Sequence, residues 1–141
     1  MRITVYIDGL TEPINPGGVT TCAFVVYQDG KKIHEEKKFV GKGKGYSNNV
    51  AEYSALHAAL HWLLEKGIRK NVEIRSDSRL LVNQMKGEWK VKGGLYVETY
   101  KRARTLADKF EDITFRWIPR EQNQEADKLS RIAYDEYLHG S

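Results

Sequence analysis

The order in which two hydrophobic periods follow one another is the feature of this sequence that most constrains its fold. Apolar and polar residues first alternate with a period of two, which predicts strands at 3–8, 19–27 and 31–40. Asp29-Gly30 is typical of a hairpin turn, so the second and third strands should form an antiparallel pair. Helical spacing begins only after the glycine-rich turn at 41–45.

The rest of the chain predicts helices separated by two short strands, and a turn-rich loop is expected earlier, at 10–18. The later elements are a helix that ends before Gly67, a strand at 72–75, a helix after Ser76-Asp77-Ser78, a helix from Tyr96 to Phe110, a strand at 113–118 and a last helix at 122–138. The order β-β-β-α-β-α-α-β-α indicates an α/β protein with one mixed sheet. A length of 141 residues suits one domain, and we expect it to span 1–141.

Composition and charge exclude several classes of protein. The single cysteine, Cys22, excludes a disulfide scaffold and a cysteine-rich zinc site, and it agrees with a reducing compartment. No apolar run could span a bilayer, and Met1 leads directly into a strand without a leader, so we expect a cytoplasmic monomer with no membrane partner. The net charge is +4 and the pI about 9.1, which suits a polyanionic partner.

Three acidic residues lie near the carboxyl ends of predicted strands. Asp8 closes the first strand, Asp77 follows the fourth, and Asp127 lies in the first turns of the helix after the fifth. The crevice of an open α/β sheet lies beyond the carboxyl ends of its parallel strands. Helix capping and complementation of the helix dipole are the alternatives for Asp77 and Asp127. Asp8 has no such structural explanation, because it continues a strand and aspartate is a poor strand residue.

Glu52 is the fourth acid, and it shares a helix face with apolar residues. Leu56, Ala59 and Leu63 lie on the same face, so the carboxylate needs a cation. An ion pair with lysine or arginine is one solution. Four carboxylates at one edge are better explained by divalent metal, and oxygen ligands favour Mg²⁺ or Mn²⁺. Two such ions per site can hydrolyse a phosphodiester, which is nuclease chemistry.

Ordered motifs along nearly the whole chain resemble the type 1 ribonucleases H, in their compact archaeal and retroelement-like branch. The segments that carry the resemblance are Tyr6-Ile7-Asp8-Gly9, Asn15-Pro16-Gly17-Gly18, Ser47-Asn48-Asn49-Val50-Ala51-Glu52-Tyr53, Ser76-Asp77-Ser78 with Leu81-Val82, and 120–130. The resemblance implies a ribonuclease H-like mixed five-stranded sheet, three strands antiparallel and then parallel strands, with helices on both faces. It also implies endonucleolytic hydrolysis of the RNA strand of RNA/DNA hybrids, leaving 5′-phosphate and 3′-hydroxyl ends.

The resemblance also assigns roles to the four acids. Asp8 would bridge two ions, Asp127 would complete the site of the ion that activates water, and Glu52 with Asp77 would hold the ion near the leaving group. Glu52 would also contact a ribose 2′-hydroxyl next to the scissile phosphate.

Contacts to the nucleic acid follow from the same resemblance. Asn15, Asn48 and Asn49 match positions used in the minor groove of the hybrid, and Ser47 stands where a threonine commonly binds a DNA phosphate. Amides and hydroxyls suit a 2′-hydroxyl, which both donates and accepts hydrogen bonds. Turn formation and helix capping are the alternatives for these residues. Trp89, among lysines, could stack on the DNA strand or anchor its own loop.

The sequence departs from the family pattern in three places. The loop from Asp8 to Asn15 is one residue longer, and no Lys/Arg-rich helix precedes Tyr96. The loop before Asp127 contains no histidine, and Arg120 is the nearest substitute. Arginine stays protonated, so Arg120 would hold a phosphate oxygen rather than transfer a proton.

Two other functions remain open from the sequence. One is a module that binds hybrids without cleaving them, and the other is a different nuclease on the same fold. Retention of all four carboxylates argues against the first, and the asparagines argue against the second. His57 and His61 share a helix face, but no further histidine or cysteine joins them to make a zinc site.

Overall fold

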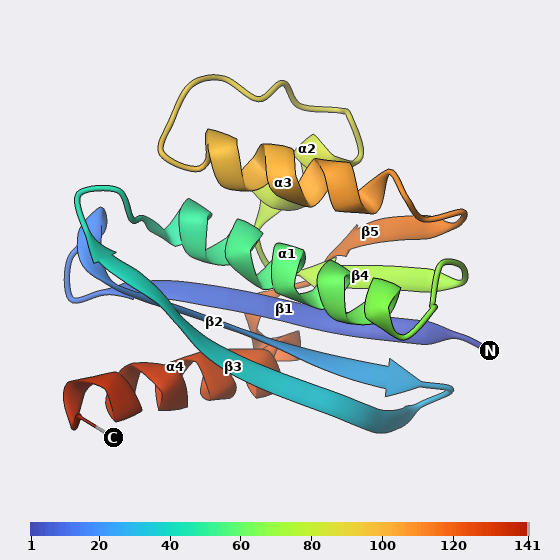
Figure 1. Ribbon diagram of the computed structural model, residues 1–141, viewed down its shortest axis with the longest axis horizontal. Helices are drawn as coiled ribbons and strands as arrows, with labels where there is room; N and C mark the ends of the chain where they lie inside the picture. Colours follow the sequence, from blue (N-terminus) through green and yellow to red (C-terminus); the bar gives the residue numbers. More distant parts are fainter. Residues whose placement is uncertain (141) are drawn as a thin grey trace.

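Five strands form one mixed sheet in the order β3-β2-β1-β4-β5 (Figure 1). The computed structural model describes residues 1–140. Its elements are β1 Ile3–Glu12, β2 Gly17–Gln28, β3 Lys31–Gly43, α1 Asn48–Glu65, β4 Val72–Ser76, α2 Arg79–Met85, α3 Val97–Ala107, β5 Ile113–Trp117, a 3₁₀ turn Arg120–Gln122 and α4 Gln124–Leu138. The predicted order of elements is confirmed.

The sheet is antiparallel on one side of β1 and parallel on the other. β1 pairs antiparallel with β2, and β2 pairs antiparallel with β3. β4 lies parallel to β1 and β5 lies parallel to β4. The carboxyl ends of β1, β4 and β5 therefore open toward the same edge, where the sequence places Asp8 and Asp77.

β1 is longer than the sequence predicts. The strand was expected to end at Asp8-Gly9 and to lead into a loop at 10–18, but pairing with β2 continues to Glu12↔Val19. The Thr11 and Thr20 hydroxyls, 2.8 Å apart, share a hydrogen bond across the two strands. Asp8 therefore lies inside the strand rather than at its end, and only the tip near 13–16 forms the turn. β3 likewise continues to Gly43 instead of ending at 40.

Helices cover both faces of the sheet. Alternate residues of β1 and β2, including Ile7 and Phe24, pack against α1 in the main core, where Tyr53 is fully buried. α4 lies on the opposite face, and its Ser130 carbonyl accepts a hydrogen bond of 2.8 Å from the Thr21 hydroxyl of β2. Figure 1 shows α1 and α4 on opposite sides of the strands. Within residues 1–140, no helix has the length and apolar character needed to cross a bilayer.

The connection between α2 and α3 carries no helix over residues 86–96, as the sequence suggests. It forms the long loop at the top of Figure 1. α3 packs against α1 rather than against the sheet edge where β1, β4 and β5 open.

Candidate active site

Three of the four predicted acids converge at the edge where the parallel strands open. One carboxylate oxygen from each of Asp8, Glu52 and Asp77 lies within 4.8 Å of the others. The register explains two of them, because the β1–β4 pairing of Tyr6 with Arg75, continued along the strands, brings Asp8 beside Asp77. Glu52 arrives from α1, which crosses β1 at this point. Residues far apart in the sequence therefore form one acidic cluster.

Gly9 allows α1 to come this close to β1. A Cβ atom built on Gly9 would lie 2.5 Å from the carbonyl carbon of Ala51, a distance that real Cβ atoms do not adopt. Since Ala51 directly precedes Glu52, any side chain at position 9 would push the first turns of α1, and Glu52 with them, away from Asp8. Glycine is poorly suited to a strand interior, and this close approach is its physical reason here.

Burial and mutual repulsion raise the pKa values of all three carboxyl groups. Burial, followed by the charge of Asp77, raises the pKa of Asp8 to about 8. The pKa of Glu52 is also raised, mainly by burial and then by the charges of Asp8 and Asp77, whereas the main chain of Gly9 opposes the shift. Burial is the main cause of the raised pKa of Asp77. Without a counter-charge, the cluster therefore retains protons that isolated carboxyl groups would lose.

Asp127 stands beside this cluster. Its carboxyl group is close enough to help raise the pKa of Asp8, and both acids line an open pocket of about 570 Å³ that also contains Glu52 and Asp77. Asp127 additionally faces Arg131, with 3.5 Å between its Oδ1 and the arginine Nε. The fourth acid, Asp127, is therefore at the site. It is more exposed than Asp8 and Glu52, and it forms an ion pair with Arg131.

Helix capping does not account for the two helix-start acids. Ser78 caps α2, since its Oγ accepts a hydrogen bond of 3.2 Å from the Leu81 amide. Asp77, one residue earlier, is left to face the pocket. Asp127 lies inside α4, and Asn123 occupies the N-cap position. Neither side chain is therefore the cap of its helix, whereas Asp127 does lie in the first turn of α4, where it complements the helix dipole.

Arg120 lines the same pocket, from the 3₁₀ turn before α4. It is exposed, and its charge lowers the pKa of Asp77 against the larger effect of burial. The guanidinium group is thus within electrostatic reach of the acids and open to a ligand in the pocket.

Three of the predicted nucleic-acid contacts form a hydrogen-bonded chain at the start of α1. The Asn15 Oδ1 accepts a hydrogen bond of 2.9 Å from the Asn48 amide, and the Asn48 Oδ1 accepts one of 2.8 Å from the Thr11 amide. Ser47 caps α1 through its Oγ, which accepts from the Val50 amide at 3.2 Å. The turn and capping alternatives are therefore real, but the NH₂ groups of Asn15 and Asn48 remain as exposed donors.

The other two predicted contacts differ in their surroundings. Asn49 is half-buried in the first turn of α1. Trp89 is 49% exposed, lies in the loop after α2 and does not line the acidic pocket. The structure therefore does not bring Trp89 together with the acids, and about half of its surface is exposed.

The donor set fits a divalent cation. Glu52 Oε2 is fully buried and has no hydrogen-bond partner among the described residues. A buried carboxylate oxygen without a partner is costly unless a cation or a proton satisfies it. Carboxylate oxygens at this spacing are the ligands that Mg²⁺ and Mn²⁺ prefer, and none of the three clustered acids forms an ion pair within residues 1–140.

Comparison with known proteins agrees with this geometry. The chain matches the reverse transcriptase-like family over residues 21–133. Ribonuclease HI of Halobacterium salinarum is 33% identical over 135 residues, covering 96% of this chain and 65% of that protein. LC11-RNase H1, solved in complex with an RNA/DNA hybrid, superposes with a TM-score of 0.87 at 34% identity, over 97% of this chain and 99% of that one. The chain belongs to the type 1 ribonuclease H family.

Some relatives of this ribonuclease H chain are much longer. The bifunctional protein Rv2228c of Mycobacterium tuberculosis is 35% identical over 136 residues, which cover 96% of this chain and 36% of that protein. The chain thus spans about a third of the length of that relative.

Asn123 is a site residue that the sequence reasoning missed. Its side chain does not cap α4 but turns inward, where Nδ2 donates to the Ile7 carbonyl at 2.8 Å and to Asp77 Oδ2 at 3.4 Å. Its Oδ1 is buried and has no hydrogen-bond partner within residues 1–140. An asparagine just before a helix is normally read as a cap, so the sequence carries no signal for this role.

Two further residues on the pocket wall were also missed. The guanidinium group of Arg79 stacks 3.9 Å from the centre of the Trp117 ring, and Trp117 Nε1 donates to the main-chain carbonyl of Asp77 at 3.2 Å. This ring contact and hydrogen bond hold the turn that carries Asp77. The only sequence signal for this contact is that the end of β5, with Trp117, is expected to lie beside the end of β4.

Proposed function

We propose that this chain is an endonuclease that hydrolyses the RNA strand of RNA/DNA hybrids and leaves 5′-phosphate and 3′-hydroxyl ends. One observation carries the proposal. Asp8, Glu52 and Asp77 converge within 4.8 Å in an open pocket, and Glu52 keeps a buried oxygen without a partner. Membership of the ribonuclease H family and the hybrid bound to LC11-RNase H1 support the choice of substrate.

In this proposal four carboxylates would hold two divalent cations, Mg²⁺ or Mn²⁺, when substrate is bound. Asp8 would contribute to both ions, Glu52 and Asp77 would hold an ion on the side of the leaving group, and Asp127 would complete the site on the side of the attacking water. Such ions supply activation of the water and stabilisation of the leaving oxygen. The charge of the ions also removes the repulsion that raises the pKa values of Asp8 and Glu52.

The remaining pocket residues orient the substrate. Glu52 also contacts a ribose 2′-hydroxyl beside the scissile phosphate, and the free NH₂ groups of Asn15 and Asn48 donate to the minor groove. Asn49 also contacts the minor groove, and Ser47, at the start of α1, binds a DNA phosphate. The Arg120 guanidinium, exposed at the pocket rim, holds a phosphate oxygen of the reacting group.

The decisive experiment is a cleavage assay on an end-labelled hybrid, with Mg²⁺, with Mn²⁺ and with a chelator. We expect wild type to cut only the RNA strand, and only with metal. Asp8→Asn should reduce cleavage by at least about a thousandfold, because it removes the ligand shared by both ions. Asp135→Asn makes the same change at an exposed position of α4 and should cleave as wild type does.

Three outcomes would overturn the proposal. Hybrid binding by wild type without cleavage in either metal would indicate a binding module that does not cut. Preferred cleavage of duplex DNA or duplex RNA would indicate a different nuclease on this fold. Normal turnover by Asp8→Asn would remove the assigned chemistry altogether. Cytoplasmic location, a monomeric state and a single domain over 1–141 stay predictions.

A further inference from the structure

The two sides of α1 differ in how cations and acids are combined. Lys38, His57 and Arg102 line a hollow between β3, α1 and α3, and none of its described wall residues is acidic. The pocket on the other side is mixed, since three arginines line it together with the acids: Arg79, Arg120 and Arg131. A cation beside a carboxylate that must bind metal competes with that metal. The contacts that hold each arginine therefore bear on the proposed chemistry.

Arg131 of α4 is the only one of the three arginines that forms ion pairs within residues 1–140. Its Nε lies 3.5 Å from Asp127 Oδ1, and its Nη1 lies 2.8 Å from Glu12 Oε2. Of these two contacts, only the one with Glu12 has the length of a hydrogen bond. The guanidinium group is thus held by Glu12, and it approaches Asp127 without bonding to it.

This preference is the reverse of what α4 alone would favour. Asp127 and Arg131 are four residues apart on one helix, with the acid nearer the N-terminus, which is the order that pairs best. An arginine carries five N–H donors in a fixed fork and can bind one carboxylate through two of them. Glu12 therefore draws the guanidinium group away from a partner that the helix itself offers.

The main chain that carries Glu12 is fixed by its neighbours. Glu12 is the last residue of β1 and pairs with Val19, in the part of the strand that extends beyond Asp8. The amide of Thr11 donates to Asn48 Oδ1 at 2.8 Å. Because side chains alternate along a strand, Glu12 projects from the same face of β1 as Asp8 does. Glu12 thus belongs to the same pocket wall as the first of the proposed metal ligands.

The charge of Arg131 acts on more than one acid of the pocket. Partial burial lowers the pKa of this guanidinium group, but the charge of Glu12, followed by those of Asp127 and Asp8, raises it above its ordinary value. Two carboxylates share one cation here, so Asp127 is not neutralised while Glu12 is present. Without Glu12, Asp127 would be the nearest acidic partner of this arginine.

We propose that Glu12 is a positioning residue that holds Arg131 off Asp127 and thereby leaves the Asp127 carboxylate available to a divalent cation. This inference rests on the proposed function, in which Asp127 completes a metal site. In the absence of Glu12, Arg131 would bind Asp127 through two N–H groups, and an incoming ion would have to displace it. Glu12 itself contacts neither substrate nor ion, since it acts through Arg131.

The first test measures the Mg²⁺ concentration that gives half-maximal cleavage of a saturating hybrid. Glu12→Gln should raise this concentration about fivefold, because Arg131 then competes for Asp127. The kcat at saturating Mg²⁺ should change less than about twofold, since enough metal displaces the arginine. A lower kcat at every Mg²⁺ concentration, with the same half-maximal concentration, would overturn the proposal, because it would indicate a general loss of structure.

The second test removes the arginine. Arg131→Gln alone should require no more Mg²⁺ than wild type does, because a competitor of the metal is gone. Adding Glu12→Gln to Arg131→Gln should have no further effect, so the double variant rescues the defect of Glu12→Gln. If Glu12→Gln raised the Mg²⁺ requirement equally with and without Arg131, the inference would be wrong, because the effect would not pass through Arg131.

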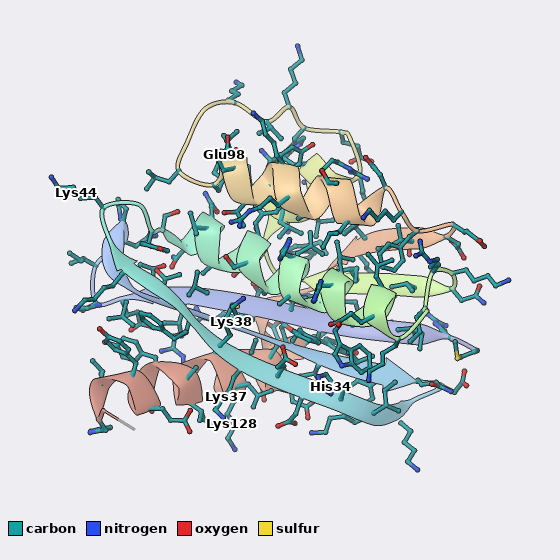
Figure 2. All side chains as sticks on the ribbon, viewed as in Figure 1. His34, Lys37, Lys38, Lys44, Glu98 and Lys128 are labelled. Atoms are coloured by element: carbon teal, nitrogen blue, oxygen red, sulfur yellow. The ribbon has the colours of Figure 1, made fainter. Side chains whose placement is uncertain are left out.

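Two control variants remove the same charges elsewhere. Glu35→Gln breaks a pair with Lys32 in which the glutamate side chain is 43% exposed, against 38% for Glu12. Lys128→Gln removes the cation that follows Asp127, and Figure 2 shows Lys128 pointing away from the sheet. Both variants should change the Mg²⁺ requirement less than about twofold. A fivefold rise in Glu35→Gln would contradict the inference, since net charge alone would explain it.

A third test needs neither substrate nor cleavage. The Nε–Hε signal of Arg131, assigned by its loss in Arg131→Gln, is observed by NMR in the metal-free protein. Glu12→Gln should shift this signal, because the guanidinium group changes its partner. Mn²⁺ binding, measured separately by EPR of the free ion, should weaken in Glu12→Gln and recover in the double variant.

The binding measurements keep this inference separate from the proposed function. An Arg131 signal and an Mn²⁺ affinity that both stay unchanged in Glu12→Gln would refute the inference even in a chain that cleaves hybrids. The expected changes in a chain that does not cleave hybrids would support the role of Glu12 and refute the proposed function. Thermal unfolding of each variant confirms that it is folded.

Discussion

Helix α1 separates two pockets, one acidic and one basic, in which crowded groups of like charge have their pKa values shifted in opposite directions. On one side, buried carboxyl groups of like charge raise the pKa values of Asp8 and Glu52. On the other, His57 lies among cations that lower its pKa. In both pockets the crowded groups shift toward their neutral forms, and a ligand of the opposite charge reverses that shift. The comparison teaches that one helix can carry a cluster of acids on one side and a cluster of cations on the other without either neutralising the other.

After the loss expected for Asp8→Asn, the largest effect comes from Gly9→Ala, which should damage the acidic side alone. The added methyl group would meet the Ala51 main chain and displace the turn that carries Glu52. We expect cleavage to fall about a hundredfold, since misplacement by about 1 Å has that effect, and stability to fall by about 1 to 3 kcal/mol. Cleavage and denaturation assays measure both.

Gly93→Ala is the matched control for this variant, because a Cβ there meets nothing within 4 Å. Hybrid binding should persist in Gly9→Ala, because the added methyl group acts on the acidic side of α1. Full activity in that variant would show that the close approach of α1 to β1 is not needed.

The next effect concerns metal-free stability. Asp8 holds its proton up to about pH 8 when folded but releases it near 3.8 when unfolded, so its contribution to stability is complete below pH 3.8 and is lost as pH rises to about 8. The raised pKa values of Glu52 and Asp77 act in the same direction. Urea denaturation with a chelator should show a loss on the order of a few kcal/mol, which Mg²⁺ reverses.

This loss of stability with rising pH should come from the acidic side of α1 alone. Asp8→Asn should be more stable than wild type at pH 8 without metal, whereas Lys38→Gln should retain the pH dependence of wild type. If wild type and Asp8→Asn had the same pH profile, the proposed crowding of carboxyl groups would be contradicted.

The smallest effect tests a cation on the acidic side. Arg120→Ala should lower kcat about tenfold and change hybrid affinity little, because Arg120 is assigned to the reacting phosphate. Arg116→Ala, at an exposed position of β5, is the control and should leave kcat unchanged. A loss confined to binding would show that Arg120 attracts the nucleic acid in general and does not act on the reacting phosphate.

The sequence predicts the acids better than their surroundings. Asp8 and Asp77 follow from strand order, and Glu52 follows from its place on an apolar helix face; each signal is local. The inward turn of Asn123 depends on the Ile7 carbonyl, 116 residues away, and no local pattern encodes such a contact. The extension of β1 past Gly9 was missed because glycine normally ends a strand, whereas here it accommodates a neighbouring helix. Pairing across long separations decides both cases.

The hydrogen bond from Asn123 to Ile7 joins the start of the last helix to the first strand. The pocket is therefore completed only late in the synthesis of these residues. During synthesis, Asp8, Glu52 and Asp77 all leave the ribosome before residue 123 does. Until then the carbonyl of Ile7 lacks this amide, and Asp127 is not yet made. A nascent chain therefore cannot assemble the complete acidic pocket before residue 127 has been translated.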